Sequence, residues 1–266
     1  MDVTFDFTGK NVFVVGGTSG INLGIAEAFS KAGARMGVAS RSQDKVDAAV
    51  EVLSGVARPA LGYAFDVRDA EAVAAALTDF AEKCGPIDVL VSGAAGNFPA
   101  FAKSLSPNGF KAVIDIDLLG TFHVMRGAYP HMRRPGGSMI NISAPQAVQA
   151  MPMQVHVCAA KAGVDMVTKC LAIEWGHEGL RVNGVIPGPI DGTEGMARLA
   201  PTEGMRKAVI NSVPMKRFGT PDDVALACMF LGSEAARYVS GSIVNADGGW
   251  AISGARIDLA LQAGGA

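Results

Sequence analysis

Short apolar runs alternate with longer segments whose apolar residues recur every three or four positions along the chain of 266 residues. The short runs have the length of buried strands, and the longer segments have the period of amphipathic helices. The stretch NVFVVGGTSGINLGIAEAF near the start predicts a strand over 12–15, a turn of small residues and a helix from Ile21 onward. The same order repeats to the end of the chain. Such alternation predicts a parallel sheet with helices on both faces.

The pattern predicts seven strands, of which the second ends near Ser40 and the others cover 12–15, 61–65, 88–91, 138–143, 181–186 and 242–246. Helices are predicted between them, over 43–53, 70–83, 107–132, 155–173 and 221–231, with a further helical insertion at about 190–215. No repeat or linker interrupts this order. We therefore expect a single domain over 1–266 with an α/β fold, a Rossmann-type doubly wound sheet of seven parallel strands.

The composition limits the classes of partner. The net charge of −2 gives no broad basic surface, so nucleic acid is not an expected partner. The four cysteines lie far apart with neither metal-ligand nor CxxC spacing, which favours reduced thiols and no bound metal. The first residues, MDVTFDFTGK, carry no apolar signal core, and no apolar run is long enough to cross a membrane. We expect a soluble cytoplasmic protein with no membrane contact.

The first turn has the features of a phosphate site. Two glycines let the backbone approach an anion closely, and the N-terminus of the next helix directs free N–H groups toward it. No Lys-Ser or Lys-Thr pair follows, so a nucleoside triphosphate loop is not indicated. An ordinary tight turn is the alternative interpretation. The loop favours nucleotide binding, with contacts expected from Gly16, Thr18, Ser19, Gly20 and Ile21.

The residues after the second strand decide the choice of cofactor. A carboxylate there would accept a hydrogen bond from the ribose 2′-hydroxyl of NAD, whereas a cation suits the 2′-phosphate of NADP. Arg41 and Ser42 follow the strand, and no carboxylate precedes Asp44. Because arginine forms a forked, charge-assisted pair with phosphate, we expect NADP(H), bound by Arg41 and Ser42. A solvated surface arginine is the alternative.

The glycine loop and later motifs resemble the short-chain dehydrogenase/reductase family. The family's Gly-x-x-x-Gly-x-Gly loop is matched at Gly16 and Gly20, but Asn22 stands where the third glycine is expected. The bulk of Asn22 leaves the packing of this loop open. The resemblance implies further cofactor contacts after three later strands, from Asp66 and Val67, from Ala94, Ala95 and Gly96, and from Pro187, Gly188 and Ile190. For Asp66, a cap of the next helix is an equal alternative.

The catalytic pattern of the family is incomplete in this sequence. The family uses a serine, a tyrosine thirteen residues later and a lysine four beyond the tyrosine, together with an asparagine on the preceding helix. Of these only Lys161 is present, because Ala144 and Val157 occupy the serine and tyrosine positions and Asp117 the asparagine position. Alanine and valine can neither polarise a carbonyl nor protonate an alkoxide.

A subgroup of the family, the 2,4-dienoyl-CoA reductases of the peroxisomal type, resembles the sequence more closely. The matching segments are AAGNF at 94–98, LSPNGFKAVIDIDLLGTF at 105–122, VHVCAAKAGVDMVTK at 155–169 and PGPIDGTEGMARL at 187–199. In that subgroup NADPH gives hydride to the δ-carbon of a dienoyl thioester, and a proton added at the α-carbon yields a 3-enoyl-CoA. Because the proton goes to carbon, the chemistry does not need a tyrosine facing an alcohol oxygen.

The resemblance implies roles for several residues. Lys161 is expected to bind the nicotinamide ribose and supply positive charge, and Asp117 to position the water that delivers the proton. An acyl-CoA substrate is expected to contact Asn97, Phe98, His156 and Gly195, the last of these in a substrate-side insertion. A homotetramer is expected, paired through the helices around 107–130 and 155–175. The alternatives are a solvent-facing Lys161, an ordinary polar helix position for Asp117, and packing roles for Asn97, Phe98 and His156.

Two rival functions remain open at this point. The first is a carbonyl reductase or alcohol dehydrogenase with a relocated acid, for which His156 is the candidate. The second is an NADP-binding scaffold or sensor that has lost catalysis, for which the departures at Asn22, Gly93, Ala144 and Val157 are the supporting features. The retained Lys161 and the matches on the substrate side favour the dienoyl-CoA reductase.

Overall fold

The computed structural model describes residues 4–56 and 58–253. A central sheet in this part of the chain has seven parallel strands in the order β3-β2-β1-β4-β5-β6-β7. The strands are β1 (Asn11–Val15), β2 (Arg35–Ser40), β3 (Leu61–Ala64), β4 (Val89–Ser92), β5 (Ser138–Ile142), β6 (Arg181–Pro187) and β7 (Ile243–Ala246). The predicted doubly wound fold is therefore confirmed, and each predicted strand lies within two residues of its observed bounds.

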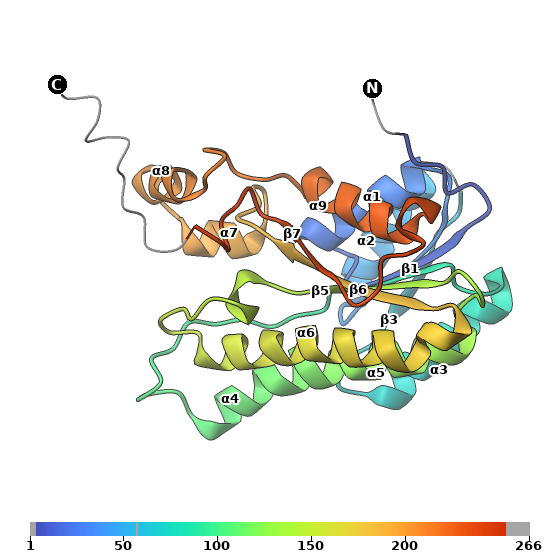
Figure 1. Ribbon diagram of the computed structural model, residues 1–266, viewed down its shortest axis with the longest axis horizontal. Helices are drawn as coiled ribbons and strands as arrows, with labels where there is room; N and C mark the ends of the chain where they lie inside the picture. Colours follow the sequence, from blue (N-terminus) through green and yellow to red (C-terminus); the bar gives the residue numbers. More distant parts are fainter. Residues whose placement is uncertain (1–3, 57, 254–266) are drawn as a thin grey trace.

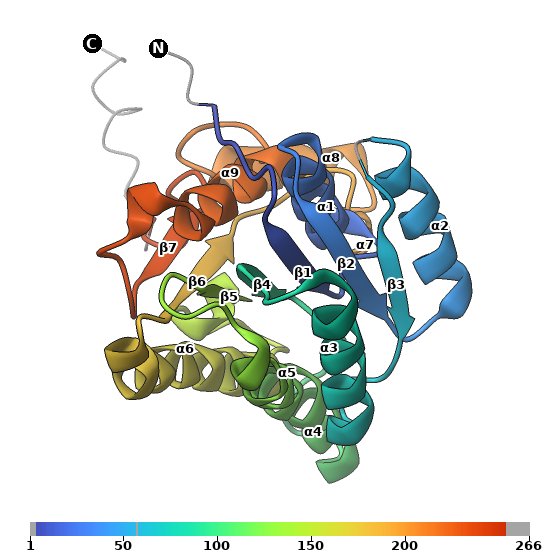
Figure 2. The same cartoon turned by 90° about the vertical axis from the view of Figure 1, so that its right-hand side faces the viewer.

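Helices cover both faces of the sheet (Figures 1 and 2). One face carries α1 (Gly20–Lys31), α2 (Gln43–Ser54) and α9 (Pro221–Gly232). The opposite face carries α3 (Ala70–Cys84), α4 (Pro107–Val113), α5 (Gly120–Ala128) and α6 (Val155–Trp175). Short 3-10 turns complete the connections at Tyr129–His131, Pro145–Ala147, Gly176–Glu178 and Glu234–Ala236. Within the described ranges, no helix is both long and apolar enough to span a bilayer.

The core has two layers because every residue of β1 is buried. Val12 and Val14 face the layer beneath α1 and α9, whereas Phe13 and Val15 face the layer above α3 and α5. Phe13 and Phe80 pack edge to face with their ring centroids 5.1 Å apart. Burial of each such ring contributes about 2–3 kcal/mol. This packing explains why continuous apolar runs, and not alternating ones, mark the strands in the sequence.

The strand order reverses at β1, which pairs with β2 on one side and β4 on the other. Val15 at the end of β1 is level with Ala39 of β2 and Ser92 of β4. The connections leaving β1 and β4 run to opposite faces of the sheet, so a crevice opens at the carboxyl ends of these strands. Any ligand held at this point meets the turns that follow β1, β2 and β4.

The predicted single helix over 107–132 is interrupted. Ser106 caps α4 by accepting from the Gly109 N–H at 3.0 Å, and Pro107 occupies the first position of the helix. A π-helical turn, Ile114–Leu119, then separates α4 from α5. The wider turn carries one more residue per hydrogen-bonded ring than an α-helix, and apolar periodicity does not reveal such a local insertion.

The insertion after β6 contains two short helices, α7 (Glu194–Leu199) and α8 (Glu203–Ser212). Thr193 and Thr202 cap them, each accepting a hydrogen bond from a backbone N–H three residues further on. Both helices lie beyond the carboxyl end of the sheet, on the side of α1 and α9 (Figure 1). The insertion therefore stands beside the crevice, where a substrate-side role had been predicted for it.

Candidate active site

The glycine loop joins the end of β1 to α1. Gly16 has a φ of +80°, and a Cβ at this position would lie 2.9 Å from the Ala94 nitrogen, so only glycine fits between β1 and the segment after β4. Ser19 precedes α1 in an extended conformation, and its side chain makes no capping hydrogen bond in the described structure. The first turn of α1 thus points backbone N–H groups at the crevice without a side-chain oxygen in their way, which suits a phosphate group.

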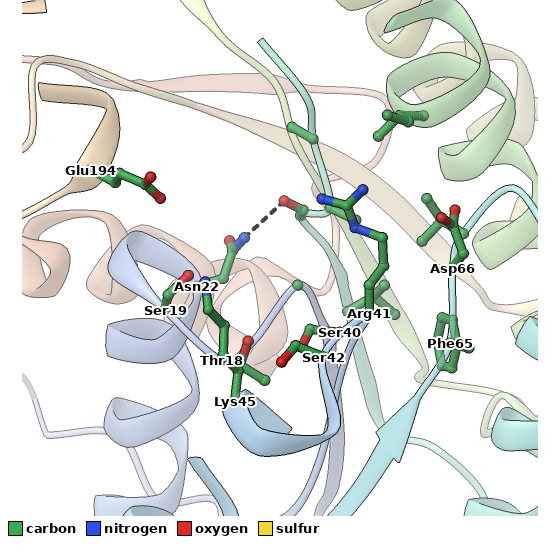
Figure 3. Close-up of a pocket in the computed structure, with 17 residues that line it drawn as sticks. Thr18, Ser19, Asn22, Ser40, Arg41, Ser42, Lys45, Phe65, Asp66 and Glu194 are labelled. Carbon is green, nitrogen blue, oxygen red and sulfur yellow. Dashed lines mark hydrogen bonds between the residues drawn. The ribbon is translucent and has the colours of Figure 1, made fainter. Parts of the chain in front are cut away.

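A cavity of about 330 Å³ occupies the crevice (Figure 3). Predicted cofactor contacts that line it are Gly16, Thr18, Ser19, Arg41, Ser42, Asp66, Val67, Ala94 and Ala95. Lining residues that were not predicted are Val15, Asn22, Ser40, Lys45, Phe65, Gly93, Ile116 and Glu194. The structure therefore brings together residues from the turns after four strands, which the glycine loop and the family resemblance had predicted to share one site.

The cavity fits a dinucleotide by its polar groups as well as its position. Asn22 Oδ1 and Ser40 Oγ are buried atoms on its lining that lack a hydrogen-bond partner within residues 4–56 and 58–253. A buried polar atom without a partner is costly, so residues of this kind are typical of a site that a polar ligand completes. Its lining includes two cations, Arg41 and Lys45, and small residues such as Gly16, Ala94 and Ala95, which match the phosphates and the flat rings of a dinucleotide.

Two cationic side chains, those of Arg41 and Lys45, point into the cavity from the end of β2 and the first turn of α2 (Figure 3). Lys45 was missed in the sequence, although its place one turn into the helix after β2 could have indicated it. The neighbouring Asp66 is paired with Arg68, 2.6 Å between Arg68 Nη2 and Asp66 Oδ2. Hydrogen bonding from Arg68, with a smaller contribution from the Arg41 charge, lowers the pKa of Asp66 against the effect of burial.

The alternative role of Asp66 as a helix cap is wrong. The cap of α3 is Asp69, whose carboxylate accepts from the N–H groups of Glu71 and Ala72 at 3.1 and 3.0 Å. Asp66 lies too far before the first turn of α3 to reach these N–H groups, because the cap must directly precede the helix. Asp66 remains on the cavity lining, and its contact with adenine stays a prediction.

Asp117 and Lys161 form a buried ion pair, with 3.5 Å between Asp117 Oδ2 and Lys161 Nζ. Asp117 lies on the π-helical turn and is 1% exposed, and Lys161 lies on α6 and is 5% exposed. The other oxygen of Asp117 accepts from the Gly96 N–H at 2.7 Å, and Lys161 donates to the Ile142 carbonyl at 3.1 Å. The pair thus links β5, α6, the π turn and the loop after β4 at one point.

The residues at the serine and tyrosine positions cannot supply an acid. Val157 is 3% exposed and packs with Val113 and Ala160 between α4 and α6. Ala144 precedes the 3-10 turn that follows β5. Beside these apolar residues, the structure brings the charged pair Asp117–Lys161 to the family's catalytic position.

The predicted substrate residues differ in their surroundings. Asn97 and Phe98 are exposed on the loop after β4. His156 is fully buried, its Nε2 is 3.0 Å from the Phe98 carbonyl oxygen, and the two rings lie 4.7 Å apart. His156 therefore holds the loop that carries Phe98, and its ring does not face solvent. Gly195 lies in the first turn of α7, where a Cβ would meet open space among the described residues.

The remaining predicted cofactor residues lie outside the 330 Å³ cavity, namely Gly20, Ile21, Gly96, Lys161, Pro187, Gly188 and Ile190. Gly188 packs so closely on the residue that follows β7 that a Cβ would lie 2.7 Å from the Asp247 Cα. Gly188 and Ile190 line a second cavity of about 260 Å³ at the ends of β6 and β7. Their contacts with a cofactor stay predictions.

Comparisons with known proteins agree with this geometry. The family model described as enoyl-(acyl carrier protein) reductase matches residues 15–251. A peroxisomal 2,4-dienoyl-CoA reductase of Danio rerio, of the (3E)-enoyl-CoA-producing type, is 41% identical over 252 residues, which are 94% of this chain and 84% of that one. A Bacillus subtilis protein named as a probable 2,4-dienoyl-CoA reductase of the (2E)-enoyl-CoA-producing type is 35% identical, with 90% and 96% of the two chains covered.

Solved structures show the same fold. A short-chain dehydrogenase of Bacillus anthracis has a TM-score of 0.81 at 36% identity, with 91% of this chain and 96% of that chain covered. A short-chain type dehydrogenase/reductase of Mycobacterium ulcerans has a TM-score of 0.89 at 28% identity, with 93% and 91% covered. With the dinucleotide crevice and the buried Asp117–Lys161 pair, these matches show that the chain belongs to the short-chain dehydrogenase/reductase family of oxidoreductases, which use a nicotinamide cofactor.

Proposed function

We propose that the protein reduces 2,4-dienoyl-CoA thioesters to 3-enoyl-CoA with NADPH, an auxiliary step in the β-oxidation of unsaturated fatty acids. The observation that carries this proposal is the buried Asp117–Lys161 pair at a site where Ala144 and Val157 replace the serine and tyrosine of the family. A ketone reductase needs an acid against the developing alkoxide, whereas reduction of a dienoyl thioester needs a proton on carbon. The relatives named as 2,4-dienoyl-CoA reductases support the same substrate.

NADPH is proposed over NADH because Arg41 and Lys45, which follow β2, both line the cavity. The Asp66 carboxylate, whose pKa the Arg41 charge helps to lower, is already bonded to Arg68. A 2′-phosphate would therefore meet two cations and a carboxylate whose charge is partly balanced. When bound, the nicotinamide supplies the hydride that the δ-carbon of the substrate receives.

The chain's own residues act on the charge and the proton that follow. Once the δ-carbon has received hydride, negative charge is shared by the γ-carbon, the α-carbon and the thioester oxygen. The Lys161 ammonium stabilises this charge, and burial strengthens the interaction. Asp117 is held in place by the Gly96 N–H and by Lys161. Its carboxylate keeps further lone pairs with which to orient a water molecule for protonation of the α-carbon. Protonation there leaves the double bond at the 3-position.

NADPH consumption with 2,4-hexadienoyl-CoA and 2,4-decadienoyl-CoA tests this function. We expect turnover with both substrates, and in D₂O we expect one deuterium at the α-carbon of a 3-enoyl product. Deuterium at the γ-carbon of a 2-enoyl product would contradict the proposed proton route. The same assay with a panel of ketones separates the carbonyl reductase. That rival is disfavoured by His156, since its ring is buried and its Nε2 is engaged by Phe98. NADPH binding without turnover of any substrate would favour the scaffold.

We also propose that the protein assembles as a homotetramer. Exposed apolar side chains gather on α6 and on the adjoining turn and start of α5, namely Leu119, Phe122, Met166 and Ile173, of which Ile173 is 83% exposed. These helices lie side by side on one face of the molecule (Figure 1). An apolar face of this kind is typical of an interface. Light scattering at micromolar concentration should give four times the monomer mass, and Ile173→Glu should lower that mass.

A cytoplasmic location is proposed as well. All four cysteines are free thiols, as expected in a reducing compartment. Several relatives are named as peroxisomal proteins, which makes the compartment worth testing directly. Fractionation of cells that produce the tagged protein should recover it with cytoplasmic markers. Recovery with an organelle would contradict the proposal.

A further inference from the structure

The position of the missing third glycine is occupied by a side chain that crosses the cofactor crevice. Asn22 lies in the first turn of α1, and its Nδ2 donates to the Gly93 carbonyl oxygen at 2.8 Å. Gly93 directly follows β4, so this hydrogen bond joins two segments 71 residues apart in the sequence. Figure 3 shows the bond at the centre of the cavity, between the glycine loop and Arg41. The carboxamide therefore ties together the two walls of the crevice.

The orientation of the carboxamide follows from its partner. The Gly93 carbonyl can only accept a hydrogen bond, so the NH₂ group of Asn22 must face it. Oδ1 is then the buried atom without a partner in the described part of the chain. An aspartate at position 22 would match the shape of asparagine and yet place two acceptors against each other. The amide donor, and not the size of the side chain alone, holds the two segments together.

Asn22 and Gly93 depend on each other sterically. A Cβ at position 93 would lie 2.3 Å from Asn22 Oδ1 and 2.5 Å from Asn22 Nδ2. These atoms are the end of a flexible side chain, so an alanine at 93 would displace the carboxamide and leave the backbone in place. The asparagine fits over the end of β4 only because position 93 has no side chain. Two departures from the family pattern, one on each side of the crevice, thus form a single unit.

The segment that Asn22 holds also leads to the catalytic pair. Three residues beyond Gly93, the Gly96 N–H donates to Asp117 Oδ1 at 2.7 Å, and Ala94 and Ala95 between them line the cavity. A shift of Gly93 therefore moves a wall of the cofactor site and the donor that orients Asp117. We propose that Asn22, paired with Gly93, is a positioning residue that fixes the loop after β4 against the glycine loop and so sets the geometry in which the cofactor binds. This inference rests on the proposed function, because it concerns the same cofactor site.

Fluorescence titration with NADPH tests the pairing by a double-mutant cycle of Asn22→Ala, Gly93→Ala and the double variant. Loss of one neutral hydrogen bond should raise the Kd in Asn22→Ala roughly three- to tenfold. Gly93→Ala should have a similar effect, because it displaces the same carboxamide. The double variant should resemble the single ones, since the alanine at 93 fills space that Asn22→Ala has vacated, so the effects should not add. Glu27→Ala, on the same helix and off the cavity lining, should bind as the wild type does.

Thermal unfolding without cofactor, and a third variant, keep the inference testable. Asn22→Asp keeps the shape but removes the donor, so it should weaken NADPH at least as much as Asn22→Ala. If Asn22→Ala and Asn22→Asp only lower the Tm, while the Kd stays within about twofold of the wild type, Asn22 is a stability residue and the inference fails. Additive effects of Asn22→Ala and Gly93→Ala would overturn it as well. Failure of the wild type to bind either NADPH or NADH would instead refute the proposed function.

Discussion

The two ends of the candidate site are built from different groups. At the proposed cofactor end, the lining consists of backbone at Gly16 and of exposed side chains such as Arg41 and Lys45. At the proposed catalytic end lie two charged side chains, those of Asp117 and Lys161, which are 1% and 5% exposed and paired with each other. Exposed charges interact through water and act nearly independently, whereas buried charges depend strongly on their partners.

This difference predicts how each end responds to substitution. A change at the cofactor end should cost affinity in proportion to one lost contact and leave the catalytic step nearly intact. A change in the buried pair should cost turnover, and the effects of two such changes should not multiply. The following substitutions test that contrast.

Asp117→Ala should have the largest effect. We expect kcat for dienoyl-CoA to fall by a factor of about 10² to 10⁴ with little change in NADPH affinity, because a positioned proton-transfer group typically contributes a rate factor of this size. Steady-state kinetics with a separate NADPH titration measures both quantities. Asp115→Ala is the matched control, since Asp115 lies on the same π turn and pairs with Lys111 at the surface. A drop of equal size in the control would show that the turn, and not the carboxylate, matters.

Lys161→Ala should lower kcat by about 10² or more, since it removes the buried positive charge beside the developing anion. The exposed Lys169, two turns further along α6, provides the control. Lys169→Ala should keep nearly full activity. The kcat of the double variant Asp117→Ala/Lys161→Ala should be only slightly lower than that of the less active single variant. If the two losses in kcat multiply, the two charges act independently and the expected difference between the two ends of the site is absent.

Arg41→Ala should raise the Kd for NADPH by about one to two decades, equivalent to roughly 1.5–3 kcal/mol for a hydrogen-bonded charge. The Kd for NADH should change far less, because it lacks the 2′-phosphate. Lys45→Ala should show the same preference with a smaller effect. Parallel titrations with both cofactors check the result, and equal weakening of NADPH and NADH would refute the assignment to the 2′-phosphate.

Asp165→Asn should have the smallest effect, a gain in stability at neutral pH. Asp165 is 7% exposed on α6, and burial raises its pKa against the influence of the Ser143 hydroxyl and the charges of Lys169 and Lys161. Folding therefore favours the protonated form of Asp165 over its ionised form, relative to the unfolded chain. The stabilising contribution of this group is complete below the ordinary value of 3.8 and is lost as the pH rises through the raised pKa.

Thermal melts over a pH series measure this effect. Asp165→Asn should exceed the wild type in Tm at neutral pH, by about 2–4 °C for each 1 kcal/mol of relief. The difference should shrink on acidification and vanish once the wild-type carboxyl is protonated. A Tm difference that does not depend on pH would mean that packing, and not the charge of Asp165, separates the two proteins.

The sequence predicted the sheet well because its strands are buried on both sides. Runs such as Val12–Val15 stand out in any window, and glycines or polar residues mark their ends. The family spacing located Lys161 and Asp117, and the structure joins them. Their distance of 44 positions in the chain carries no signal of contact without the fold.

The rest of the site could not be predicted from local sequence patterns, because it depends on contacts between distant residues. The hydrogen bond of Asn22, for example, is made to Gly93, 71 residues away. Two aspartates, Asp66 and Asp69, precede α3, and either could cap the N-terminus of a helix. Only the observed start of α3 at Ala70 identifies Asp69 as the cap. Lys45 was overlooked because a lysine in the first turn of a helix usually lies in solvent.

The π turn at Ile114–Leu119 sets the rotation of α5 about the helix axis relative to α4. Val113 on one side packs against α6, while Val124 and Met125 on the other side pack beneath the sheet with α3. Each residue of an α-helix turns the chain by about 100°, so deleting one residue from the turn would rotate one flank by that amount relative to the other. Either Asp117 would turn away from Lys161, or the apolar side chains of α5 would no longer pack against α3. A relative that keeps the aspartate but lacks the extra residue would not present its carboxylate to the lysine, so the Asp117–Lys161 pair depends on the length of this segment as much as on its composition.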